Sequence, residues 1–191
     1  MAAPTSTAPR LEDLVGDYAL DPAHTRIGFT ARHAMVTRVR GQFREFQGHG
    51  HLDMDPAKTW AEVRIQAGSI DTGNDQRDEH LRQNDFLDAQ HYPEIVFRST
   101  HVERVSDEVY RVTGDLTIKA TTRAITIDLH YTGAVTDPFG NLRLGLEGTT
   151  TINRKDWGVS WNVALEAGGM LVSECINIEI DVSAIKVGPD Q

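Results

Sequence analysis

His33 is the first side chain in this sequence whose type and position could do chemistry. It ends a stretch in which Ile27, Phe29 and Ala31 alternate with polar residues. This alternation predicts a strand with His33 on its apolar face. A histidine in that position can meet the head group of a ligand, or it can be a core histidine that is hydrogen-bonded to a neighbour. Both interpretations stay open at this point.

A second group, Arg77, Asp78 and His80, has the residue types of an acid–base site. On a helix, Arg77 and His80 lie one turn apart with Asp78 beside them. The same spacing suits a charge-paired helix cap that fixes one end of the fold. We favour the cap because it is the simpler interpretation.

The remaining candidates for chemistry are weaker. His49 and His51 are two residues apart and share one face of a strand, a spacing that can chelate a metal, but no third ligand is evident. Cys175 has no identifiable base. The sequence also contains no G-x-S-x-G, no phosphate-binding glycine loop and no H-E-x-x-H motif. We therefore predict no catalytic residue, no metal site and no cofactor, and we expect a protein that is not an enzyme.

Strands are the elements that must position these residues. Period-two alternation predicts roughly eight antiparallel strands, three of them before a helix and five after it. The predicted strands cover residues 26–33, 42–54, 60–67, 95–102, 109–118, 122–135, 142–152 and 176–182. The helix is predicted at about 74–83, with Asn74 as its N-cap and His91-Tyr92-Pro93 beyond its end. A lone helix in a β domain covers an edge or closes one end of a barrel.

The apolar faces of these strands must all point to the same side. Eight strands are the number at which a closed barrel is just wide enough to be filled or to hold one small ligand. Gly114 and Gly148 fall in register with large apolar residues, and we expect them to leave local space inside. Periodicity alone is compatible with a filled core or with a cavity.

Composition excludes several classes of protein. The chain has 191 residues and a formal charge of −9, which disfavours nucleic acid as a partner. Residues 1–12 are predicted to form a disordered tail, and 13–191 a single domain. The N-terminal residues lack a basic start and an apolar run of signal length, and no segment approaches the ~20 apolar residues of a membrane span. We therefore expect a soluble cytoplasmic protein without stable membrane insertion.

A glycine-bearing connection follows the seventh predicted strand. It carries Trp157, Trp161 and Met170. An apolar segment of this kind suits the mouth of a pore or a subunit interface, and it can equally fold back onto the core.

The sequence resembles the YceI-like family from Tyr18 to Val187. The resemblance is carried by the motifs YALDPAHTRIGFTARHAM, GQF, SIDTGNDQRDEHLRQNDFLDAQHYPEIVF, VTGDLTI followed by TTRAI, TINRKDWG and GGMLVSECINIEI. It implies an all-β fold, an extended, lipocalin-like barrel of eight antiparallel strands with a short helical insertion. It also implies an apolar pore for a polyisoprenoid chain and a homodimer.

With this resemblance, the preferred function is to bind, sequester or transport a polyisoprenoid or similar long-chain apolar lipid, such as an isoprenoid quinone precursor or a polyprenyl phosphate. The alternative is an enzyme that acts on such a lipid, with His33 or the cluster of Arg77, Asp78 and His80 as acid or base. The expected ligand-binding residues are Ile27, Phe29, Ala31, His33, Phe86, Val112, Gly114, Leu116, Ile127, Leu129, Gly148, Trp157, Trp161, Met170 and Ile178.

Overall fold

The computed structural model describes residues 10–188. Its strands are β1 (Gly16–Leu20), β2 (Arg26–His33), β3 (Thr37–Phe43), β4 (Phe46–Leu52), β5 (Trp60–Gln66), β6 (Ile70–Asp71), β7 (Glu94–Arg104), β8 (Val109–Ile118), β9 (Thr121–Thr136), β10 (Leu142–Asn153) and β11 (Cys175–Lys186). The α-helices are α1 (Leu11–Leu14) and α2 (Asp75–Arg82), and the 3-10 helices are η1 (Pro56–Lys58), η2 (Ala67–Ser69) and η3 (Arg154–Trp157).

The sheet closes on itself. Its strands pair in the order β1-β4-β5-β7-β8-β9-β10-β11, and β11 pairs back with β1 through Tyr18↔Lys186, Ala19↔Ile185 and Leu20↔Ala184. All pairings are antiparallel. The predicted barrel of eight antiparallel strands is therefore confirmed, and closure leaves these strands without a free edge.

The sequence undercounted the strands before α2, because two of the barrel positions are each built from two pieces and the two-residue β6, which pairs with β3, was not predicted. β1 and β2 pair one after the other with the same edge of β11. On their far side, β4 pairs with β1 and β3 pairs with β2. Short interruptions at 21–25 and 44–45 separate the pieces. The five strands after α2 and the helix itself lie where alternation and capping predict them.

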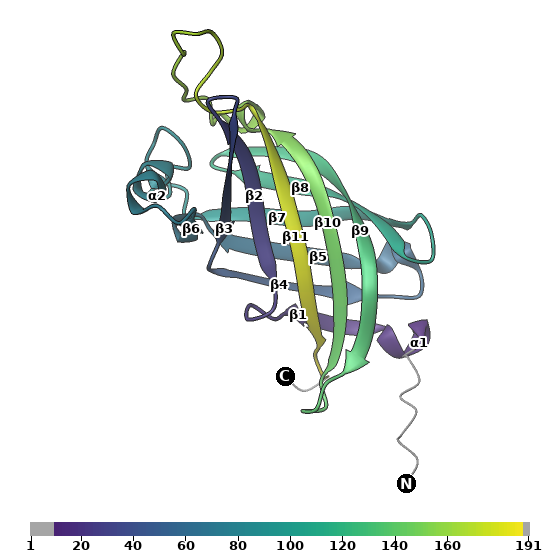
Figure 1. Cartoon of the computed structure of the whole chain (residues 1–191). Coiled ribbons are helices and arrows are strands. Elements are labelled where there is room, and N and C mark those ends of the chain that lie inside the picture. The colour runs from purple at the N-terminus through teal and green to yellow at the C-terminus, as the bar shows by residue number, and fades with distance from the viewer. Residues whose placement is uncertain (1–9, 189–191) are drawn as a thin grey trace.

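The two ends of the barrel carry different elements. α2 and the long connection after η3 lie at one end, which we call the α2 end, and α1 lies at the other, the α1 end (Figure 1). A cluster that includes Ile27, Ile65, Leu116 and Trp157 is buried toward the α2 end. A smaller cluster of Tyr18, Leu144 and Ala184 is buried toward the α1 end.

The domain begins earlier than residue 13. Leu11 and Glu12, which the sequence places in the tail, belong to α1, and Leu14 is buried. The Tyr18 hydroxyl fastens this helix by donating to the Leu14 carbonyl oxygen at 2.6 Å. The rest of the predicted tail, residues 1–9, lies outside the described residues. Within the part of the chain that is described, no helix is long and apolar enough to span a membrane.

Acid should loosen the α1 end through Arg143. Its Nη1 donates to Asp21 at 2.5 Å, and its Nε to Asp137 at 2.7 Å. The hydrogen bond from Arg143, with a second from His24, lowers the pKa of Asp21 to about 2. Burial opposes the shift at Asp137, but hydrogen bonds from Asn141, Arg143 and Phe139 lower the pKa of that carboxyl as well.

A carboxyl with a lowered pKa in the folded state stabilises the fold at a pH above its unfolded value, about 4, and loses that contribution as the pH falls toward 2. We therefore expect the midpoint of thermal unfolding to fall more steeply between pH 4 and pH 2 in the wild type than in Arg143→Met. Parallel curves for the two proteins, measured by circular dichroism, would contradict this assignment.

Candidate functional site

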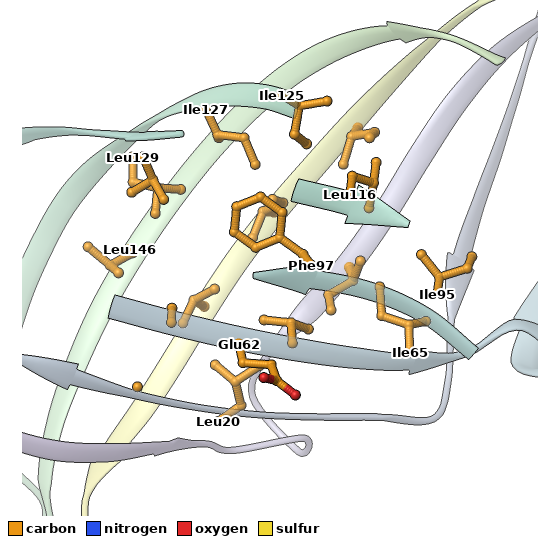
Figure 2. A pocket seen from close by; sticks show the side chains of 18 of the residues that line it. Leu20, Glu62, Ile65, Ile95, Phe97, Leu116, Ile125, Ile127, Leu129 and Leu146 are labelled. Atoms are coloured by element: carbon orange, nitrogen blue, oxygen red, sulfur yellow. The ribbon is translucent and has the colours of Figure 1, made fainter. Parts of the chain in front are cut away.

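The barrel encloses a cavity of about 520 Å³. This volume lies within the ~300–1,000 Å³ typical of small-molecule sites. Its wall is mainly apolar, and every strand of the closed ring contributes to it. Figure 2 shows side chains from several strands, among them Ile65, Leu116, Ile127 and Leu129, converging on this space. Alternation produces this arrangement, because every second residue of each strand points inward.

Gly114 and Gly148 do not produce the cavity. A Cβ on Gly114 would lie 2.5 Å from the Phe97 ring, and one on Gly148 would lie 2.9 Å from a methyl group of Leu129. Neighbouring side chains therefore already fill the space that we expected these glycines to leave, and neither glycine lines the cavity. In Figure 2 the Phe97 ring extends among the apolar side chains of the wall.

The α1 end of the cavity is lined by tyrosines. Tyr18, Tyr110 and Tyr131 all contribute to the wall there. Burial, reinforced by Tyr131, raises the pKa of Tyr18 to about 12. Burial, with a smaller effect of Tyr110, also raises the pKa of Tyr131. The phenols of Tyr18 and Tyr131 therefore stay neutral at physiological pH.

Arg154 contributes the charge at the α2 end. This residue begins η3 and is 5% exposed, and it lines the cavity together with Val159 and Val172. Trp157, at the end of the same short helix, is 3% exposed and donates its indole N–H to the Leu116 carbonyl oxygen at 2.9 Å. Trp157 belongs to the packed cluster behind the wall and does not line the cavity.

A second hollow, of about 500 Å³, adjoins the α2 end. His33 and Trp161 line this hollow and not the main cavity, whereas Phe29, Ala31 and Phe86 line both. Trp161 packs edge-on against His80, with ring centres 4.8 Å apart. His33 is exposed at the end of β2, so it is neither a core histidine nor a residue of the main cavity, because the strand runs past the rim.

Arg77 and Asp78 both bind Thr72 and do not pair with each other, so the group of Arg77, Asp78 and His80 is not a cap of paired charges. Asp78 is buried and accepts from the Thr72 backbone N–H at 2.9 Å and from the Thr72 hydroxyl. Arg77 donates to the same hydroxyl at 2.7 Å. The two charged residues thus hold Thr72 between them and make no direct ion pair, and His80 bonds instead to Asp85 at 2.8 Å. The predicted N-cap is present, since Asn74 accepts from the Arg77 backbone N–H.

The structure separates the expected ligand-binding residues into groups. Those that line the main cavity are Ile27, Phe29, Ala31, Phe86, Val112, Leu116, Ile127, Leu129 and Ile178. Gly114, Gly148 and Trp157 do not line it, and Met170 lies in the connection, where it pairs with Ala164 and lines neither hollow. Both predicted arrangements of the connection therefore occur. Trp157 packs back onto the core, and Trp161 lies at the rim.

Sequence reasoning missed the polar and aromatic residues that shape the two ends of the cavity. Arg154 sits in the motif TINRKDWG, but nothing in a single sequence shows that an arginine between a strand and a tryptophan is buried. Phe97 is an inward-facing residue of β7. Its position over Gly114 follows from the cross-strand neighbourhood of β7 and β8, which alternation alone does not give.

His49 and His51 both line the cavity toward the α1 end. The exposed His49 packs edge-on against Trp60, and His51 bonds to Asp17 at 2.7 Å. No group of three or more His, Cys, Asp or Glu side chains in residues 10–188 is arranged to hold a metal ion. Cys175 is exposed at the start of β11.

Comparisons with known proteins agree with the geometry. The model of the YceI-like domain matches residues 18–184. A UPF0312 protein of Vibrio cholerae is 36% identical over 75% of this chain and 77% of its own length. A UPF0312 protein of Staphylococcus aureus is 34% identical over 85% of this chain and 94% of its own length.

Solved structures show the same fold. The YCEI protein of Campylobacter jejuni is 30% identical, with a TM-score of 0.70 over 88% of this chain and 97% of that one. A polyisoprenoid binding domain from Saccharophagus degradans has a TM-score of 0.68 at 13% identity, over 89% of this chain and 98% of that one. The closed barrel, the enclosed apolar cavity and the family match over most of the chain lead to one conclusion: this chain belongs to the YceI-like family.

Proposed function

We propose that this protein binds a polyisoprenoid or a similar long-chain apolar lipid in the barrel cavity, and so sequesters or transports it. The observation that carries the proposal is the apolar wall of the 520 Å³ cavity, to which every strand of the ring contributes. The solved polyisoprenoid binding domain, which shares this fold, supports the same class of ligand. Isoprenoid quinone precursors and polyprenyl phosphates are ligands of this kind.

The driving force for binding is the transfer of hydrocarbon out of water. Each buried methylene contributes ~0.8 kcal/mol before the ordering costs of the chain. An acyclic prenyl chain has no polar group along its length, so the wall needs no hydrogen-bonding partners for it. Affinity should therefore rise with chain length, from geraniol to geranylgeraniol.

Binding without catalysis is the simplest role for these residues. Asp78 and Arg77, the charged residues that resemble an acid–base site, are engaged by Thr72. The proposal also includes a cytoplasmic location and a homodimer, which the sequence and the family resemblance lead us to expect. Cell fractionation and analytical ultracentrifugation test these two points independently of ligand binding.

Narrowing the cavity should weaken binding without disturbing the outer surface. Ile178 lines the cavity near the middle of β11, and we expect Ile178→Trp to weaken geranylgeraniol binding by at least about 10-fold, because the larger ring takes the space of the chain. Thr149→Trp is the matched control, since Thr149 is exposed on the neighbouring strand β10. Equilibrium binding of labelled geranylgeraniol measures both variants. Equal affinity of Ile178→Trp and the wild type would place the ligand elsewhere.

A further inference from the structure

The guanidinium of Arg154 is a buried cation in the wall of the cavity. The residue is 5% exposed, and it is one of three buried polar or charged residues in the described part of the chain, with Thr25 and Asp78. Its neighbours Val159 and Val172 also line the cavity. Arg154 therefore faces the space that the proposed function assigns to a ligand.

Neutral oxygen atoms, and no carboxylate, bind this guanidinium. Nε donates to the Ser173 carbonyl at 2.9 Å, Nη1 to the Val159 carbonyl at 2.6 Å, and Nη2 to the Val172 carbonyl at 3.4 Å. Arginine has five N–H groups, so these three bonds leave one N–H on each Nη atom without a protein acceptor in residues 10–188. No carboxylate of the described chain forms an ion pair with Arg154, whereas many of its arginines have such a partner.

Glu174, the acidic residue whose charge acts on Arg154, is already engaged. Glu174 pairs with Lys155 at 2.5 Å. Arg104, the other arginine of the cavity wall, is balanced by Asp107 at 3.0 Å. Within residues 10–188 no carboxylate thus contacts the Arg154 guanidinium, whereas the α1 end of the cavity is lined by the Arg104–Asp107 pair, by tyrosines and by His49 and His51.

A buried cation without a carboxylate in contact is costly, and burial lowers the pKa of Arg154 although the charge of Glu174 opposes the shift. An anion that entered the cavity would lower that cost. The planar guanidinium presents paired N–H groups that match the oxygen atoms of a carboxylate or a phosphate, and such charge-assisted bonds are stronger than neutral ones. The unused N–H groups on the two Nη atoms are suited to this kind of acceptor.

We propose that Arg154 binds the oxyanion of the ligand, a carboxylate or a phosphate, at the α2 end, with the apolar chain running through the barrel toward the tyrosines of the α1 end. This inference rests on the proposed function and adds the polarity and the orientation of the ligand. The competing role for Arg154 is purely structural, because its bonds to the carbonyls of residues 159, 172 and 173 also fasten the connection after η3.

Ligands that share one chain and differ in head group separate these roles. The probes are geranylgeranyl phosphate, geranylgeranoic acid and geranylgeraniol, and the measurement is the equilibrium dissociation constant of each. We expect the wild type to bind at least one of the anions about 10-fold or more tighter than the alcohol, as a charge-assisted hydrogen bond implies. The tighter of the two anions identifies the head group as phosphate or carboxylate.

In Arg154→Met the ratio of the dissociation constant of the alcohol to that of the anion should fall to about one. The dissociation constant of the alcohol should change little, since only the charge-assisted bond is lost. Arg154→Lys, which keeps the charge, should retain part of the preference. The matched control is Arg111→Met, which removes an arginine paired with Asp128 at 2.7 Å and should leave the preference unchanged.

The outcomes that contradict each proposal differ. Equal binding of the anions and the alcohol by the wild type overturns the role of Arg154, as does an equal loss of all three ligands in Arg154→Met, which is the structural result. If Arg154→Met does not fold, the test rests on the wild type and Arg154→Lys. A preference of the wild type for the anion that Arg154→Lys partly retains supports the role of Arg154, and its absence from the wild type overturns that role. Failure of the wild type to bind even the alcohol contradicts the proposed function itself.

Discussion

Gly114→Leu should severely destabilise this protein. A Cβ at Gly114 would lie 2.5 Å from the Arg98 carbonyl oxygen and 2.5 Å from the Phe97 ring. The ring can rotate away, but the carbonyl belongs to the paired strand β7 and cannot move without breaking the ladder. Overpacking a core typically costs ~1–3 kcal/mol, and a backbone collision should place this variant at or above the upper end of that range. Urea denaturation measures the loss.

Gly68→Ala is the control for Gly114→Leu. Gly68 is exposed in η2, and a Cβ there meets no atom within 4 Å. Its free energy of unfolding should stay within ~0.5 kcal/mol of the wild type. A Gly114→Leu protein as stable as Gly68→Ala would show that Phe97 and β7 do not occupy the space over this glycine.

Trp157→Ala should have a comparably large effect. The indole is 3% exposed, packs in the cluster of Ile65, Ile95 and Leu116, and donates to the Leu116 carbonyl. Removing a buried tryptophan costs ~3–5 kcal/mol through lost contacts and the cavity that is left. This variant also leaves the Leu116 carbonyl without its indole donor. Chemical denaturation again provides the measurement.

Trp60→Ala makes the same chemical change at an exposed site, since Trp60 is 44% exposed on β5. We expect it to cost less than about 1 kcal/mol. Similar losses for the two tryptophan variants would contradict the position of Trp157 in the packed cluster.

The sequence predicts the barrel because most of its strands alternate and its helix is well capped. In β8, Val112 and Leu116 point inward and Asp115 points outward, and this alternation alone decides the two faces. Asn74 marks the start of α2 for an equally local reason. The division of two barrel positions into β1 with β2, and β3 with β4, depends on pairing with β11 and with each other, which no local pattern encodes.

Alternation predicts those residues of the cavity wall that lie on the inward face of a strand. Ile27, Ile127 and Ile178 belong to such faces and line the space. Gly114 shares an inward face, but whether it leaves room depends on the Phe97 side chain from the next strand. The burial of Arg154 likewise depends on carbonyls that lie far along the chain, at residues 172 and 173. Contacts between distant segments therefore account for what the sequence could not show.

The central claim is that the barrel cavity holds a long apolar chain. Mass spectrometry of the lipid that co-purifies with the protein from its native host tests it most directly, with Ile178→Trp prepared in parallel. We predict an isoprenoid or similar long-chain lipid on the wild type, and much less of it on Ile178→Trp, because the larger side chain takes space that the lipid chain needs. A wild-type protein that carries no such lipid, or a variant that carries as much as the wild type, would contradict the claim.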